Sequence, residues 1–86
     1  MTSNEIKEAT QKLAGTLRRT RQTEWARELE DALGDDGPVT NQMLGDILWI
    51  LRRLNGTSLP GMLGNSATIT ELIDSIDKLF KTKKQS

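Results

Sequence analysis

The stretch that most restricts the fold is NQMLGDILWILRRL, residues 41–54, because its apolar residues recur with the period of an α-helix. At about 100° per residue they occupy one arc of roughly 160°. So wide an arc predicts a helix covered by more than one neighbour, which makes this segment the central helix of the core. It argues against a DNA recognition helix, which must offer polar side chains to bases and phosphates. The residues of the arc are Met43, Leu44, Ile47, Leu48, Ile50, Leu51 and Leu54.

Three more segments have helical periodicity, and no segment alternates as a strand does. The pattern predicts helices over 4–20, 23–33, 41–54 and 68–82, with a bend at 20–23 and a turn at 35–40. Gly34 and Asn55-Gly56 mark the ends of the second and third helices. We therefore expect an all-α protein, a compact four-helix bundle-like single domain over residues 1–86 with a short disordered tail about 82–86. The expected N-terminal caps are Ser3, Thr23, Thr40 and, in a capping box with Glu71, Thr68.

The four predicted helices differ in how much apolar surface they offer to a core. The first has only three large apolar residues on its stripe, Ile6, Leu13 and Leu17, so we expect it to be the least firmly docked. The second places Trp25, Leu29, Ala32 and Leu33 on one face. The side chains expected to be among the most buried are Ile47, Leu48, Leu51, Leu29, Leu72 and Ile76.

The composition argues against catalysis. The chain has no histidine, tyrosine or cysteine, so it lacks the side chains that most often serve as general base, metal ligand or thiol nucleophile. We expect no enzymatic activity, no cofactor and no metal site. The absence of cysteine favours a reducing compartment, and no apolar run approaches the ~20 residues of a membrane-spanning helix. The expected location is the cytoplasm, with no membrane partner.

The twelve basic and twelve acidic residues cancel in number but are segregated along the chain. A helix that begins beside one cluster and ends beside another would pair them within the fold, and this is the simplest interpretation. The acidic cluster would alternatively steer the protein toward a basic partner such as a nuclease toxin. The clusters are basic at Arg18, Arg19 and Arg21, acidic at Glu28, Glu30, Asp31, Asp35 and Asp36, and basic at Lys78, Lys81, Lys83 and Lys84.

Two apolar features do not fit a simple helical core. Trp49 falls on the polar side of its own helix, between Asp46 and the pair Arg52 and Arg53. The connection NGTSLPGMLGN, residues 55–65, is uncharged and carries apolar side chains where a linker is normally polar. Either this connection or the first helix folds over the indole as part of the core, with Gly45 making room beneath, or connection and indole form an exposed surface for a partner. The expected partner-binding residues are Trp49, Leu59, Met62, Leu63, Arg52 and Arg53.

Three stretches of the chain, TEWARELEDAL, LNGTSLPGML followed by Asn65, and LIDSIDKLF, carry a resemblance to a known group of proteins. The chain resembles a family of small bacterial all-helical proteins without a characterised activity, some of which look like immunity proteins that block a toxin by binding it. The resemblance covers roughly residues 13–80 and rests on Trp25, the Gly61-Met62 pair, Asn65 and the helix spacing. The segment LPGMLGN is shorter and less polar than the loop of that family. The resemblance implies a helical fold and a bacterial source, and it carries over no functional residue.

Among the possible functions, the sequence favours a bacterial or phage interaction protein that binds another protein, as an immunity protein, an inhibitor or an adaptor does. The partner would be another protein, for example a toxin or nuclease, and a homodimer is a further possibility. The alternative is a nucleic-acid-binding accessory protein. Zero net charge and few aromatic residues argue against that alternative. It would use Arg18, Arg19, Arg21, Arg52, Arg53 and the Lys-rich C-terminus.

Overall fold

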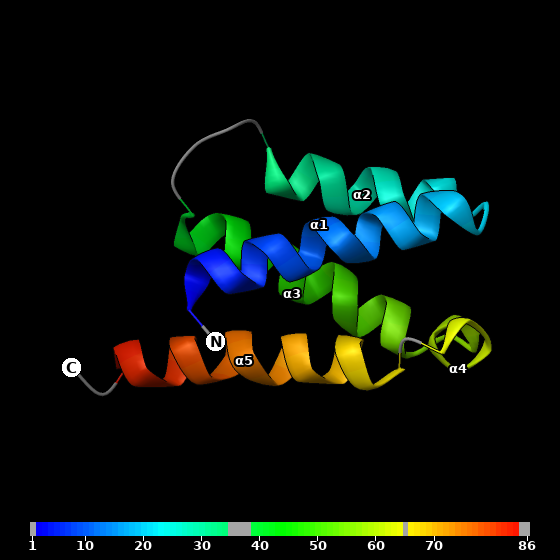
Figure 1. The fold of residues 1–86 in the computed structure, drawn as a ribbon. Helices are drawn as coiled ribbons and strands as arrows, with labels where there is room; N and C mark the ends of the chain where they lie inside the picture. Colours follow the sequence, from blue (N-terminus) through cyan, green and yellow to red (C-terminus); the bar gives the residue numbers. More distant parts are fainter. Residues whose placement is uncertain (1, 35–38, 65, 85–86) are drawn as a thin grey trace.

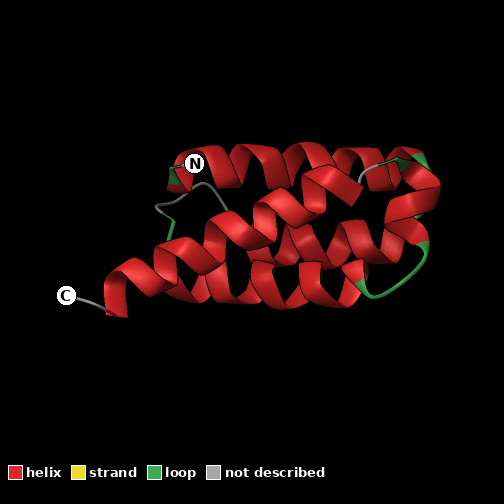
Figure 2. Ribbon diagram, turned by 90° about the horizontal axis from the view of Figure 1, so that it is seen from below, coloured by secondary structure: helices red, strands yellow, loops and turns green. Residues whose placement is uncertain are grey.

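The computed structural model describes residues 2–34, 39–64 and 66–84, and it describes only the backbone of residues 82–84. Within these ranges the chain forms five helices and no strand, in one compact all-α domain (Figures 1 and 2). Four helices are long and one is a single short turn. They are α1 (Ser3–Arg19), α2 (Thr23–Leu33), α3 (Asn41–Asn55), α4 (Leu59–Leu63) and α5 (Ser66–Lys84).

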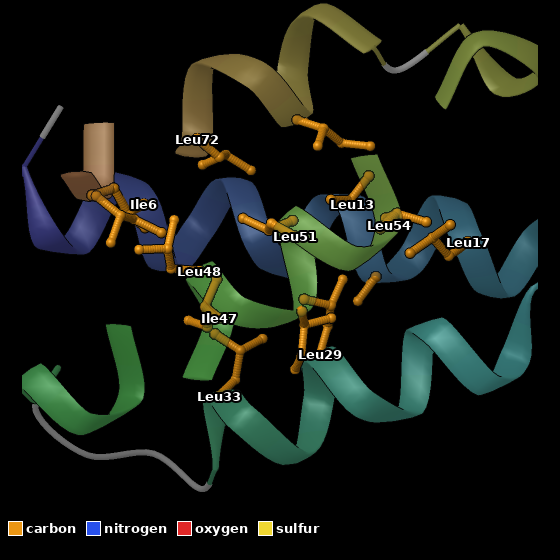
Figure 3. Close-up of a cluster of buried hydrophobic side chains, with 14 of the residues drawn as sticks. Ile6, Leu13, Leu17, Leu29, Leu33, Ile47, Leu48, Leu51, Leu54 and Leu72 are labelled. Atoms are coloured by element: carbon orange, nitrogen blue, oxygen red, sulfur yellow. The ribbon is translucent and has the colours of Figure 1, made fainter. Parts of the chain in front are cut away.

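The four long helices pack as neighbours around a shared core. α1 and α3 each contact both α2 and α5, while the short α4 covers the ends of α3 and α5 where these two helices are joined. Buried side chains from all four long helices meet in the middle of the molecule (Figure 3). Every side chain expected to be among the most buried is buried, and α3 contributes the largest group, so its predicted central position is confirmed.

The N-terminal caps were predicted with mixed success. Thr40 caps α3 as predicted, because its hydroxyl accepts a hydrogen bond from the Met43 N–H at 3.1 Å. For α1 the prediction of Ser3 was wrong. The cap is Thr2, whose hydroxyl accepts from the Glu5 N–H at 3.2 Å while the Glu5 carboxylate accepts from the Thr2 N–H at 3.0 Å. This is a complete capping box, so the exposed carboxylate three residues after Thr2 fixes where α1 begins.

The bend between α1 and α2 removes the cap expected at Thr23. Arg21 adopts a positive φ of 67°, and the N–H of Gln22 donates to the Leu17 carbonyl at 2.7 Å, so the chain passes almost directly from one helix into the next. Gln22 occupies the cap position without a side-chain hydrogen bond, and Thr23 is already helical. At the other end of α2, Gly34 has φ of +66°, in agreement with its predicted role.

The connection 55–65 is partly helical, which the sequence interpretation missed. α3 ends at Asn55 with Gly56 as its C-cap, as expected, and α4 then begins at Leu59 with Pro60 in its first turn, where a proline costs no hydrogen bond. The Thr57 hydroxyl accepts from the Leu59 N–H at 3.2 Å. Gly64, at φ of +72°, ends the turn in the left-handed region.

The last helix is longer at both ends than predicted. α5 begins at Ser66, so Thr68 lies inside the helix and does not form the expected capping box with Glu71. At the other end, residues 82–84 continue the helix although they were expected to belong to the disordered tail, since lysine is a good helix former and its charge suits a helix C-terminus. Residues 85–86 of the expected tail and residues 35–38 of the turn predicted at 35–40 lie outside the described residues.

Candidate protein-interaction site

The candidate site lies on the α2–α3 face and is centred on Trp49. Because the buried arc of α3 faces the core, the indole projects from the opposite side of the helix and is 61% exposed. Trp49 and Met62 are the two large apolar side chains exposed in the part of the chain that the structure describes. A tryptophan this exposed is unusual, since large aromatic side chains are normally mostly buried.

Arg53 holds the indole in place. It follows Trp49 by one turn of α3, and its guanidinium carbon lies 4.6 Å from the centroid of the Trp49 ring. The same guanidinium lies 5.5 Å from the ring of Trp25, a half-buried residue of α2. Both distances are within the range of cation–π attraction. Arg53 therefore joins an exposed indole on one helix to a half-buried indole on the next.

An ion pair fixes this arginine from the other helix. Nη1 of Arg53 donates to Oε1 of Glu28 on α2 at 3.3 Å. Both side chains are about half exposed, so the pair contributes less than ~1 kcal/mol to stability, and its main effect is on geometry. The Arg53 guanidinium is thus paired with Glu28 and lies within cation–π distance of both rings.

A shallow hollow opens beside the indole between the two helices. Its floor is apolar and its rim is acidic, with Glu28, Asp31 and Ala32 supplied by α2 and Asp46 and Ile50 by α3. Among the described ion pairs, none involves Asp31 or Asp46. A second hollow lies further along the same face at the beginning of α2. It is lined by Arg18, Thr23, Glu24, Trp25, Arg27, Glu28 and Arg53.

The structure divides the predicted partner-binding residues among three places. Trp49 and Arg53 lie together against α2, but the neighbouring Arg52 turns toward α5, where its Nη2 donates to both carboxylate oxygens of Asp77 at 3.0 and 3.1 Å. Leu59 and Leu63 of α4 are half-buried against the core, while Met62 is 77% exposed. The hollow beside Trp49 is lined by residues of α2 and α3 and by none of the connection 55–65, so a surface shared by indole and connection stays a prediction.

Gly45 also has a different role from the one expected. A Cβ built at this position would meet no atom within 4 Å, so the glycine does not make room for a close contact beneath the indole.

Sequence reasoning missed the contribution of α2 to this site. Trp25 and Glu28 were noticed only as a core face and as part of an acidic cluster, and their contact with Arg53 spans at least 25 residues of chain. The sequence did contain one signal for ion pairs between helices, because its basic and acidic clusters were expected to pair within the fold. One described pair joins two of these clusters, Arg18 with Glu30. Glu28 of the acidic cluster pairs with Arg53 and Arg52 pairs with Asp77, but Arg52, Arg53 and Asp77 lie outside the clusters. Asp35, Asp36 and the side chains of Lys83 and Lys84 lie outside the described residues.

No protein-family model, curated protein or solved structure matches this chain. The resemblance to small bacterial helical proteins therefore stays a prediction. Across residues 2–34, 39–64 and 66–84, no cluster of three or more acidic, histidine or cysteine side chains is arranged to hold a metal ion. Over the same ranges, no helix has both the length and the apolar character needed to cross a membrane.

Proposed function

We propose that this chain is a small interaction protein that acts by binding another protein through the α2–α3 face, with Trp49 as the anchor. The observation that carries the proposal is an indole that is 61% exposed yet held by Arg53 and, through it, by Glu28. Tryptophan and arginine are the residues most enriched among those that dominate binding energy at protein interfaces. A protein that acts in this way would be an immunity protein, an inhibitor or an adaptor in a bacterial cytoplasm.

The way the indole is held supports binding more than folding. Trp49 is not part of the buried core, so the domain does not depend on burying its indole. A side chain that already has a neighbour on one side loses less conformational entropy when a partner covers it. The position of the Arg53 guanidinium beside both indoles therefore supports a role for this surface in binding a partner.

Nucleic-acid binding, the alternative function, receives less support from the geometry. Binding to phosphates would require several arginines on one face that are not already paired with carboxylates. Arg18, Arg52 and Arg53 each donate to a carboxylate of the chain itself. The three pairs also point to different helices, namely α2 and α5. A binding assay with duplex and single strands over a range of salt concentrations would detect any real phosphate contacts by their steep salt dependence.

The test of the proposed function is site-specific photo-crosslinking. A benzophenone amino acid replaces Trp49 in one variant and the exposed Thr70 of α5 in a control variant, and each is irradiated in cells that express the protein. We expect one dominant crosslinked protein from position 49 that position 70 does not give. A product of twice the 9.6 kDa chain would identify the partner as a second copy. Identical products from both positions, or none from position 49, would contradict the proposal.

A further inference from the structure

We propose that the partner side chain received at this site is a cation, an arginine or a lysine, that lies on the exposed indole of Trp49 between the carboxylates of Asp31 and Asp46. The inference rests on the proposed function and adds the chemistry of the group that is bound. It is carried by the hollow beside the indole, by the charges on its rim, and by the contact that Trp49 already makes with Arg53.

The shape of the hollow suits a long side chain with a charged end. Ala32 and Ile50 give an apolar floor against which a methylene stem can lie, and the indole forms one wall. Asp31 from α2 and Asp46 from α3 stand on the rim, so a charged group at the end of that stem would meet a carboxylate from each helix. Arginine and lysine are the side chains that combine an apolar stem with a cationic head.

Two of the three carboxylates on the rim have no ion-pair partner among the residues that the structure describes. Glu28 is already paired with Arg53, whereas Asp31 and Asp46 are exposed and belong to none of the ion pairs among the described residues. Arg27 lies one turn before Asp31 on α2, yet no ion pair joins the two. An apolar or acidic partner covering this hollow would desolvate two carboxylates without compensation, which is strongly unfavourable. A basic side chain compensates both.

The contact that the Trp49 indole already makes within the protein is with a cation. Arg53 already places a guanidinium 4.6 Å from the ring centroid, with the carboxylate of Glu28 at 3.3 Å from that guanidinium. Asp46 precedes Trp49 by three residues and Arg53 follows it by four, so the two charged groups lie on opposite sides of the indole along α3. A partner cation next to Asp46 would repeat the arrangement of cation, indole and carboxylate on the other side of the same ring.

The test is an NMR titration of the intact protein with three short probes. The probes are acetyl-Gly-Arg-Gly-amide, the same peptide with neutral citrulline in place of arginine, and the same peptide with glutamate. The readout is the indole N–H signal of Trp49, assigned with the Trp25→Phe variant. We expect a saturable shift with the arginine peptide and at least fivefold weaker binding of the citrulline and glutamate peptides.

Two double variants separate a specific site from general electrostatic attraction. Asp31→Asn with Asp46→Asn should weaken binding of the arginine peptide at least fivefold. Glu8→Gln with Glu71→Gln changes the net charge equally at exposed positions of α1 and α5, and it should leave binding within twofold. Equal loss in both variants, or no saturable shift of Trp49, would overturn the inference. A crosslink at position 49 together with a null titration would overturn the inference alone and leave the proposed function standing.

Discussion

Glu5 is a residue whose ionisation is linked directly to the folded structure. The Thr2 N–H donates to its carboxylate at 3.0 Å, and this backbone hydrogen bond, with a further contribution from the Thr2 hydroxyl, lowers the pKa of Glu5 below its ordinary value. A carboxyl group whose pKa is lowered by folding stabilises the protein above its unfolded-state pKa. That stabilisation is lost as the pH falls through the folded-state pKa.

The linkage predicts a pH-dependent effect of Glu5→Gln. Glutamine keeps a hydrogen-bond acceptor at the third position of the capping box but cannot ionise. We expect the variant to be less stable than the natural protein at neutral pH and equally stable in acid below the folded-state pKa of Glu5. Urea unfolding followed by circular dichroism at both pH values measures the difference. A difference that does not change between the two conditions would show that the charge of Glu5 has no role.

Two glycines in similar sequence settings should respond oppositely to alanine. Gly45 lies inside α3 with nothing within 4 Å of an added Cβ, so Gly45→Ala should stabilise the protein by about 0.5–1 kcal/mol through helix propensity. Gly34 has φ of +66°, so Gly34→Ala should destabilise it by about 1–2 kcal/mol. Thermal melts of both variants provide the comparison. Destabilisation by Gly45→Ala would mean that this glycine does serve a close contact.

At the scale of elements, α1 shows why counting large apolar residues underestimated a helix. It was expected to be the least firmly docked helix, but it packs against both α2 and α5, and five of its residues are buried. Thr10 and Ala14 are fully buried beside the large residues, and small side chains allow close approach of two helices. The Thr10 hydroxyl donates to the Ile6 carbonyl at 2.7 Å, so its burial leaves no unpaired polar group.

This packing changes the expected ranking of core substitutions. The sequence alone suggested that Leu13→Ala would cost less than Ile47→Ala or Leu51→Ala on the central helix. Leu13 is only 3% exposed, so we now expect all three to destabilise the protein by about 2–5 kcal/mol. The exposed neighbour Lys12 gives a control, since Lys12→Ala should stay within about 0.5 kcal/mol of the natural protein. A Leu13→Ala cost close to that of Lys12→Ala would restore the original ranking.

The long helices were predictable because their information is local. Apolar periodicity and the caps at Thr40 and Gly34 lie within a few residues of the features they determine. The start of α5 and the turn α4 were not predicted, since Thr68 offers the same capping pattern as a true cap and five residues are too few to show a period. The cap at Thr2 was missed for the same reason, because Ser3 next to it has an equally suitable hydroxyl.

For the whole molecule, Trp49 and Met62 provide a direct test of where a partner binds. Both are exposed, so Trp49→Ala and Met62→Ser should leave helicity and melting temperature nearly unchanged. Because Trp49 lies in the α2–α3 face and Met62 on α4, only Trp49→Ala should abolish recovery of the partner that crosslinking at position 49 identifies. Pull-down of the identified partner measures this. Equal losses would support the single surface that the sequence suggested.

The position of the candidate site could be predicted only in part. The helical wheel of residues 41–54 places Trp49 on the polar side of its helix, as the structure does, but whether another segment covers it was left open by the sequence. Which element lies beside it depends on how α3 is oriented between α2 and α5, and no local pattern determines that orientation. The same orientation of α3 determines the partners of two adjacent arginines. Arg52 pairs with Asp77 of α5, while Arg53 pairs with Glu28 of α2.

The arrangement of neighbouring helices also bears on how quickly the domain folds. α1 with α2, and α2 with α3, are joined by short connections, so most of their contacts form between segments close in sequence. Such local contacts require little loop closure and are typical of helical domains that fold in microseconds to milliseconds. The contact between α1 and α5 joins the first helix to the last and needs the largest closure. It should therefore form late, and substitutions at that interface should accelerate unfolding more than they slow folding.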